Sequence, residues 1–348
     1  MIAVSTRHAP GPSPAAVEAV RAVGDLGAAP APDAGPLRQA IAAHYGIPEA
    51  AVRVGGGTAA LLHGCIARQA TSTDRQTSSD DRQANVGDRE ATLGRLICST
   101  PSWPPYAQIA TAYGMRPHQI PLAGYDHNLP AIAGAAGPGT RLVMLDSPHH
   151  LTGTTVDLDL ARELAADLPP GAAVVYDNVY GEYQDDHLDA GIRDTIASGA
   201  RVLICRTFSK AHQLFGLRVG YLLAHPQVMA GFGPLVLRYD VNQIAQAAAL
   251  ASLADPGHLA GNRLIVHRNR RLVTALLDAA GIACAPSQGH GVFFVPEDCA
   301  RAADLLRAAG ATVRTPDDHG VDGHLHLRVD DLPTDALCDT VIHLLELS

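Results

Sequence analysis

The sequence contains one lysine, Lys210, among 26 lysine and arginine residues in all. An arginine cannot replace a lysine where an amine must lose its proton and attack a carbonyl, because a guanidinium stays protonated at any working pH. The chain therefore keeps one side chain that is able to form a Schiff base. A single lysine could also be an accident of composition, so its meaning depends on the residues around it.

Polar side chains follow two predicted strands close to this lysine. Asp177 and Tyr180 come after the apolar run AAVVY, and Thr207 and Ser209 come after the run RVLIC. Each residue alone fits a structural role, because an aspartate after a strand usually caps a helix or makes a turn. Only their occurrence together at strand ends indicates a catalytic site.

Three glycines, Gly55, Gly56 and Gly57, lie between a predicted strand at 51–54 and a predicted apolar helix at 59–67. Free backbone N–H groups and the positive end of the helix dipole meet at such a junction and can bind an anion. Plain turns use glycines in the same way. The loop alone therefore does not decide between a phosphate site and a turn.

Strands and helices alternate along most of the chain, which predicts an α/β fold with a mostly parallel sheet covered on both faces. A ligand is expected at the carboxyl ends of the strands. We expect strands at 51–54, 95–99, 115–120, 141–145, 172–176, 201–205, 219–223, 292–295 and 325–329. We expect helices at 14–23, 37–46, 59–67, 105–113, 159–166, 241–253, 257–280, 300–309 and 334–345.

Composition excludes several classes of function. The net charge of −9 and the absence of a basic block argue against nucleic acid as a partner. No signal-peptide pattern or membrane-spanning run is apparent, so a soluble cytoplasmic protein is expected. The six cysteines lack paired spacing, which predicts buried thiols in a reducing compartment, and we expect no metal site.

A polar segment at 68–92 interrupts the alternation of strands and helices. It is rich in Asp, Arg, Ser, Thr and Gln and has no apolar periodicity. Such a segment buries too little apolar surface to order itself easily, so we expect a mobile surface insertion. A partner-docking role is the alternative.

A set of motifs occurs in order along nearly the whole chain: the glycine loop, TPSWPPY, SPHHLTG, YDNVYGEY, TFSKAHQLFGLRVGY, YDVNQIAQAAAL and LHLRV. With these motifs the chain resembles the fold-type I pyridoxal-phosphate (PLP) aminotransferases of class I/II, particularly the histidinol-phosphate aminotransferase-like branch. The polar segment is the main part without a match. The resemblance implies a large domain with a mostly parallel seven-stranded sheet and a smaller α/β C-terminal domain.

The resemblance implies a role for each matching residue. Lys210 would hold PLP as a Schiff base and shuttle the α-proton, and Asp177 would pair with the pyridine nitrogen. Tyr180 would donate a hydrogen bond to the 3′ oxygen of the ring, and Trp103 would stack on it. Arg328 would hold the substrate carboxylate. The cofactor phosphate would be bound by Gly57, Thr58, Ala59, Thr207, Ser209 and Arg218.

Some positions depart from the pattern of the family on the substrate side. His149 and His150 stand where the family has two asparagines, so His150 would replace the amide that hydrogen-bonds the 3′ oxygen. A neutral imidazole can donate one hydrogen bond but can also titrate, so a tolerated replacement and an added acid–base role both remain open. His8, in an altered N-terminal segment, is a further candidate substrate contact. Ala29 replaces a tyrosine that reaches the cofactor phosphate of the neighbouring subunit.

The resemblance also divides the chain into three parts. Residues 1–34 would join the small domain, and residues 35–240 would form the large PLP-binding domain that carries the insertion at 68–92. Residues 241–348 would supply linking helices and the small C-terminal domain.

We therefore predict a PLP-dependent aminotransferase that acts on an amino acid or amine, as a homodimer with no nucleic-acid or membrane partner. One alternative is a PLP-dependent decarboxylase or an elimination or cyclisation enzyme, for example on a hydroxylated or guanidino amino acid. A second alternative is a PLP-binding scaffold without turnover. The substrate and the amino donor remain open.

Overall fold

The computed structural model describes residues 11–71, 94–185, 188–233, 235 and 237–332. Several predictions lie outside these residues, namely the helix at 334–345, the contact of His8 and most of the polar insertion. None of the described helices is both long and apolar enough to cross a membrane.

A seven-stranded sheet forms the centre of the molecule, in the order β1-β7-β6-β5-β4-β2-β3. All neighbouring pairs are parallel except those of β7, which runs antiparallel to both β1 and β6. The predicted fold class is confirmed. The strands are β1 (Val52–Gly55), β2 (Arg95–Thr100), β3 (Arg116–Pro121), β4 (Thr140–Asp146), β5 (Ala173–Asp177), β6 (Val202–Thr207) and β7 (Gly220–Leu223).

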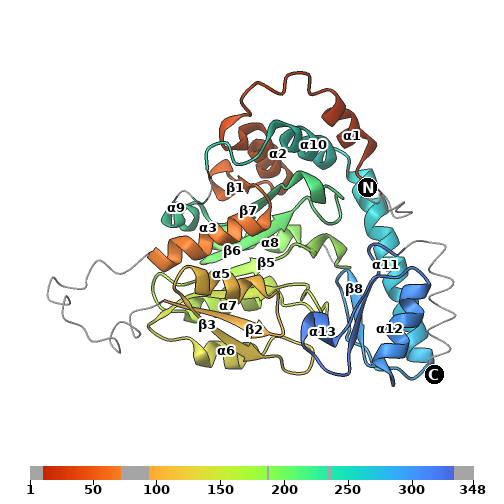
Figure 1. Ribbon diagram of the computed structural model, residues 1–348. Coiled ribbons are helices and arrows are strands. Elements are labelled where there is room, and N and C mark those ends of the chain that lie inside the picture. Colours follow the sequence, from red (N-terminus) through yellow and green to blue (C-terminus); the bar gives the residue numbers. More distant parts are fainter. Residues whose placement is uncertain (1–10, 72–93, 186–187, 234, 236, 333–348) are drawn as a thin grey trace.

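Helices cover both faces of this sheet because successive strand residues point to opposite faces and both faces are apolar. One face packs against α3 (Thr58–Thr71), α5 (Pro105–Ala112) and α9 (Pro226–Phe232). The other face packs against α2 (Gly35–Tyr45), α6 (Leu129–Ala135), α7 (Leu158–Asp167), α8 (Asp189–Ser198) and α10 (Gln243–Leu253). Figure 1 shows this arrangement, with α1 (Pro14–Arg21) lying beside α10.

A second, three-stranded antiparallel sheet lies beside the large one, drawn in blue in Figure 1. Its strands are β8 (Gly291–Phe294), β9 (Val313–Arg314) and β10 (Leu325–Arg328), in the order β8-β10-β9. It shares an apolar core with α11 (Pro256–Ala279) and α12 (Cys299–Ala308), and α13 (Pro316–His319) follows β9. The exact domain boundaries stay a prediction.

Local signals placed most helix ends correctly. The Ser13 side chain caps α1 by accepting a hydrogen bond from the N–H of Ala15, and α2 ends at Gly46 in the left-handed conformation. The expectation of buried cysteines holds for Cys65, Cys98 and Cys205 but is wrong for Cys284 and Cys299, which are half-buried. The short elements α6, α9, α13 and β9 were not predicted, because few residues give a weak periodic signal. The helix α8 was also missed, although it is as long as α7.

Candidate active site

Lys210 lies three residues beyond the end of β6, in a cavity of about 280 Å³ at the carboxyl edge of the large sheet. Its Nζ is 5.0 Å from the ring centroid of Tyr180 and 5.5 Å from that of Phe215. Tyr180 is buried and stacks on His290, with ring centroids 3.9 Å apart and an interplanar angle of 4°. The predicted lysine and tyrosine are therefore side by side in one cavity.

Asp177, the last residue of β5, lines the same cavity and is 5% exposed. The hydroxyl of Tyr106 donates a hydrogen bond of 2.7 Å to its Oδ2. Its Oδ1 is buried and has no hydrogen-bond partner among the described residues. Burial raises the pKa of Asp177 to about 7. An unpartnered buried carboxylate oxygen fits a ligand that presents a cationic N–H group.

Tyr106, whose residue type and sequence position suggest a packing role, does pack in the core and also contributes to the site. Its ring is buried against Trp103 at 5.2 Å between centroids, but its hydroxyl is part of the site. Its partner lies 71 residues away in the sequence, so spacing gave no signal.

The predicted phosphate site surrounds the start of α3. Gly57 has φ +89, and a Cβ on it would lie 2.6 Å from Nη2 of Arg218. Thr58 and Ala59, which begin α3, line the cavity together with Arg218. The backbone N–H groups of the first helical turn have no helical acceptor and can bind a phosphate, as can the guanidinium.

Two hydroxyl-bearing residues complete the wall of the cavity at the predicted phosphate site. Thr207 and Ser209 both line the cavity, and the N–H of Ser209 donates a hydrogen bond of 3.0 Å to Oγ1 of Thr207. The side chain of Arg218 is exposed, lies over Phe215 at 5.0 Å, and donates to the carbonyl of that residue at 3.0 Å. The wall thus combines hydroxyl groups, amide groups and one cation.

Trp103 and His150 line the opposite part of the cavity. Both also line an adjoining cavity of about 290 Å³ that contains Ser102, Asp318 and His319. The two cavities therefore share a wall that contains Trp103 and His150.

Arg328 is not among the residues that line either cavity. Its Nε and Nη2 each donate a hydrogen bond of 3.0 Å to Asp330, and its Nη1 lies 3.1 Å from Asp331. Although burial opposes the charge, these carboxylates raise the pKa of Arg328. Arg314 lines both cavities instead, and no ion pair or hydrogen bond of its guanidinium occurs among the described residues. Sequence reasoning missed Arg314, because the two-residue strand β9 that carries it gives no periodic signal.

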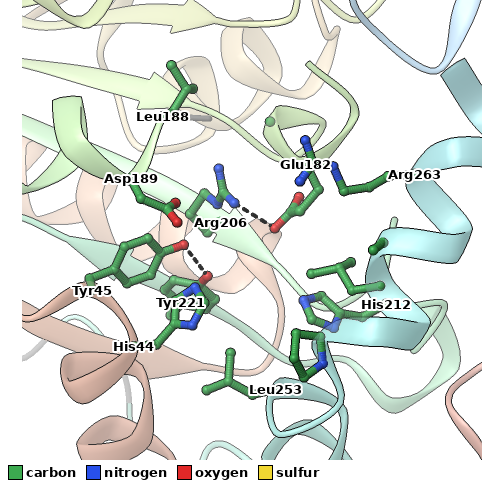
Figure 2. A pocket seen from close by; sticks show the side chains of 14 residues that line it. His44, Tyr45, Glu182, Leu188, Asp189, Arg206, His212, Tyr221, Leu253 and Arg263 are labelled. Carbon is green, nitrogen blue, oxygen red and sulfur yellow. Dashed lines mark hydrogen bonds and ion pairs between the residues drawn. The ribbon is translucent and has the colours of Figure 1, made fainter. Parts of the chain in front are cut away.

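A third cavity, of about 230 Å³, lies behind the site and contains none of the predicted catalytic residues. Figure 2 shows its main feature, a buried ion pair of 2.8 Å between Arg206 and Glu182. Arg206 also donates to Oδ1 of Asn178, whose Nδ2 donates to the carbonyl of Ser147. These bonds connect residues at the ends of β4, β5 and β6. They therefore stabilise the strand ends that carry the active-site residues.

The residues present fit PLP. The cavity offers an amine for its aldehyde, an unpartnered carboxylate oxygen for its ring nitrogen, and a phosphate cradle in which a Cβ at Gly57 would collide with Arg218. When bound, PLP supplies an aldehyde that captures amines and a ring that withdraws electrons.

Comparison with known proteins agrees with this geometry. Residues 88–342 match the family Aminotransferase class I and II. The chain is 29% identical to a histidinol-phosphate aminotransferase of Moorella thermoacetica, over 92% of this chain and 78% of that protein. It is 31% identical to an aromatic amino acid aminotransferase of Thermobifida fusca, over 89% of this chain and 82% of that protein.

Among solved structures, the histidinol-phosphate aminotransferase of Sinorhizobium meliloti in complex with pyridoxal-5′-phosphate matches with a TM-score of 0.77. The two sequences are 25% identical, and the match covers 97% of this chain and 87% of that one. The chain therefore belongs to the class I and II aminotransferases and is a PLP-dependent aminotransferase.

Proposed function

We propose that this aminotransferase acts on an amino acid or amine that carries an anionic group, and that Arg314 binds this group. The proposal rests on the contrast between two arginines. Arg314 lines both cavities and has no carboxylate partner among the described residues, whereas Arg328 is paired with two carboxylates. A free guanidinium beside the cofactor site favours a carboxylate or a phosphate on the substrate.

The adjoining cavity supports a substrate with a ring. It has room for a side chain, and Trp103 offers an aromatic surface there. Its polar groups include the acidic Asp318 and the imidazole of His319. The named relatives act on histidinol phosphate and on aromatic amino acids, so we propose one of these two classes as the substrate.

The roles of the site residues follow from their positions. Lys210 would form the covalent link to PLP and move the proton, Asp177 would pair with the ring nitrogen, and Tyr180 would contact the ring beside Lys210. The phosphate is bound by Gly57, Thr58, Ala59, Thr207, Ser209 and Arg218. Trp103 and His150 would contact the ring. The substrate contacts of His8, which lies outside the described residues, and of Arg328, which is paired with Asp330 and Asp331, stay predictions from the resemblance.

We also propose a homodimer. Phe215 is 59% exposed at the edge of the cofactor cavity, and Leu237 and Tyr239 are 79% and 52% exposed. Large exposed apolar side chains, of which Phe215 lines the cofactor cavity, are typical of a surface that a second subunit covers. Sedimentation or light scattering would measure the mass in solution, and a monomer at micromolar concentration would contradict the proposal.

The central experiment is a substrate panel on the PLP-loaded enzyme, in which keto product, carbon dioxide and water loss are measured. We expect keto product from histidinol phosphate or an aromatic amino acid, and none from Lys210→Ala. Carbon dioxide or water loss without keto product would favour the decarboxylase or cyclisation alternative, and no spectral change with any amine would favour the scaffold.

A second experiment tests the anion site. We expect Arg314→Gln to raise KM about 10- to 100-fold with a smaller effect on kcat, because a charge-assisted hydrogen bond contributes about 1.5–3 kcal/mol. Arg301→Gln, on an exposed face of α12, is the matched control. An unchanged KM in Arg314→Gln would refute this assignment.

A further inference from the structure

A second carboxylate, Asp146, stands next to Asp177 at the carboxyl edge of the large sheet. The two are paired in register as the last residues of the parallel strands β4 and β5. Both line the cavity of Lys210, and Asp146 is 4% exposed. A buried carboxylate needs partners that stabilise its charge.

His150 supplies two of these partners. Its backbone N–H donates a hydrogen bond of 2.9 Å to Oδ2 of Asp146, and its ring Nδ1 lies 3.1 Å from the same oxygen. Burial alone would raise the pKa of Asp146, but the neighbouring histidines His149, His150 and His127 hold it below its ordinary value. Since an ionised carboxylate only accepts hydrogen bonds, Nδ1 of His150 carries the hydrogen.

The other ring nitrogen of His150 is available. With the hydrogen of Nδ1 directed at Asp146, Nε2 is the ring nitrogen that can accept a hydrogen bond or a proton. No hydrogen-bond partner of Nε2 occurs within the described part of the chain, and the ring lines both the cofactor cavity and the adjoining one. Nε2 therefore meets whatever the cavities contain.

The neighbouring histidines are occupied differently. His149 lies 5.1 Å from His150 between ring centroids, and both of its ring nitrogens are hydrogen-bonded to backbone groups. Burial lowers the pKa of His149 to about 4, so it is neutral at pH 7. Both ring nitrogens of His127 are bonded as well, to Ser99 and to the carbonyl of Asp146. Ligand atoms of His127, Asp146 and His149 lie within 4.8 Å of one another, but these bonds make the group a hydrogen-bond network.

The remaining charged or titratable groups near His150 line the two cavities or lie in β10. Asp177 and Lys210 share the cofactor cavity, and His326 is buried beyond it in β10. The adjoining cavity contributes Arg314, Asp318 and His319. Asp146 is the carboxylate that hydrogen-bonds the ring of His150 among the described residues.

The order of the strands places His150 relative to a bound PLP ring. The phosphate-binding groups follow β1, β6 and β7, Asp177 ends β5, and Asp146 ends β4 on the other side of β5. In PLP the phosphate arm and the ring hydroxyl lie on opposite sides of the axis from ring nitrogen to aldehyde. If the nitrogen lies at Asp177 and the phosphate lies toward β7, the hydroxyl side of the ring would face β4, which His150 follows in the chain.

We propose that Asp146 and His150 form a carboxylate–imidazole pair in which Nε2 of His150 takes up and returns a proton at the side of the cavity where the hydroxyl of a bound PLP ring would lie. The inference rests on the proposed roles of Lys210 and Asp177. When Nε2 takes up the proton of a hydroxyl in the cavity, an N–H bond replaces an O–H bond, and the carboxylate of Asp146 balances the imidazolium charge. An amide at this position could donate or accept a hydrogen bond, but it could not take up the proton. His150 is then a catalytic residue, and Asp146 is a positioning residue.

The first test is a pH titration of the absorption of bound PLP, which needs no turnover. We expect the wild-type enzyme to show a transition that His150→Asn lacks, and Asp146→Asn to move it to lower pH because the imidazolium loses its counter-charge. The exposed His118 supplies the matched control His118→Asn, which should titrate like the wild type. Superimposable curves for the wild type and His150→Asn would overturn the proposal.

The second test is NMR of ¹⁵N-histidine-labelled protein, in which the signal missing from His150→Asn identifies the ring. We expect the Nδ1–H tautomer, and the Nε2–H tautomer would overturn the pair. This arm works with or without PLP. Failure of PLP to bind would therefore refute the proposed function, whereas a wrong tautomer in a PLP-binding protein would refute only this inference.

Discussion

Removing the hydroxyl of Tyr106 tests how Asp177 is kept ready for the cofactor. Tyr106→Phe keeps the buried ring and its contact with Trp103, and it deletes one hydrogen bond of 2.7 Å to Oδ2 of Asp177. Because the other carboxylate oxygen already lacks a partner among the described residues, the buried carboxylate would lose its only side-chain donor there. A hydrogen bond to a charged group contributes about 1.5–3 kcal/mol. We therefore expect PLP to bind about 10- to 100-fold more weakly.

The assay is a titration of the cofactor-free enzyme with PLP, followed by absorption and by quenching of the Trp103 fluorescence. Tyr113→Phe, at the exposed end of α5, is the matched control and should bind as the wild type does. Thermal unfolding of both variants reports whether the fold is kept. A PLP affinity of Tyr106→Phe within about twofold of the wild type would refute the reasoning that this bond stabilises the ionised carboxylate.

Three further predictions concern the supports of the site. Glu182→Gln removes one partner of a buried ion pair and should lower the free energy of unfolding by about 3–5 kcal/mol in denaturant melts. Glu18→Gln, in an exposed pair, should change the free energy of unfolding by less than about 1 kcal/mol. Equal effects of the two substitutions would contradict this prediction. Gly57→Ala should weaken PLP binding at least about tenfold by direct titration, while Gly171→Ala, with φ +81 but open space, should cost stability without changing PLP affinity. Burial raises the pKa of Asp177 from 3.8 to about 7. The contribution of this group to the free energy of unfolding of the cofactor-free enzyme is therefore full below about pH 4 and is lost as the pH rises to about 7. The loss is at most about 4 kcal/mol. Asp177→Asn should lack this decline in denaturant melts across that range, and parallel pH profiles would contradict the assignment.

The fold was predictable because its signals are local and repeated. Apolar runs of strand length alternate with helical patterns, and caps such as Ser13 and Gly46 mark helix ends within a residue or two of their observed positions. The short α13 and β9 escaped prediction because four and two residues are too few for a periodic pattern. Their position matters, since β9 presents Arg314 to the site.

The predicted site is partly reproduced. Lys210, Asp177 and Tyr180 lie together in one cavity, as the strand-end pattern suggested. Arg328 is paired with Asp330, and the strand pattern gave no signal for this contact, because Asp330 lies beyond the end of β10. The bond between Asp146 and His150 spans only four residues but depends on the turn between them.

The sequence by itself determined the chemistry available to this protein. It provides one amine able to form a Schiff base, a glycine loop before a helix, and strand ends that carry Asp177 and Tyr180, because these depend on residue type and on local backbone preference. Only the tertiary structure decided how these groups are partnered. Tyr106 reaches Asp177 across 71 residues, and among the described residues Arg314 has no ion pair while Arg328 is paired. The reason is that hydrogen bonds and ion pairs form between atoms that the packing of separate elements brings within about 3 Å.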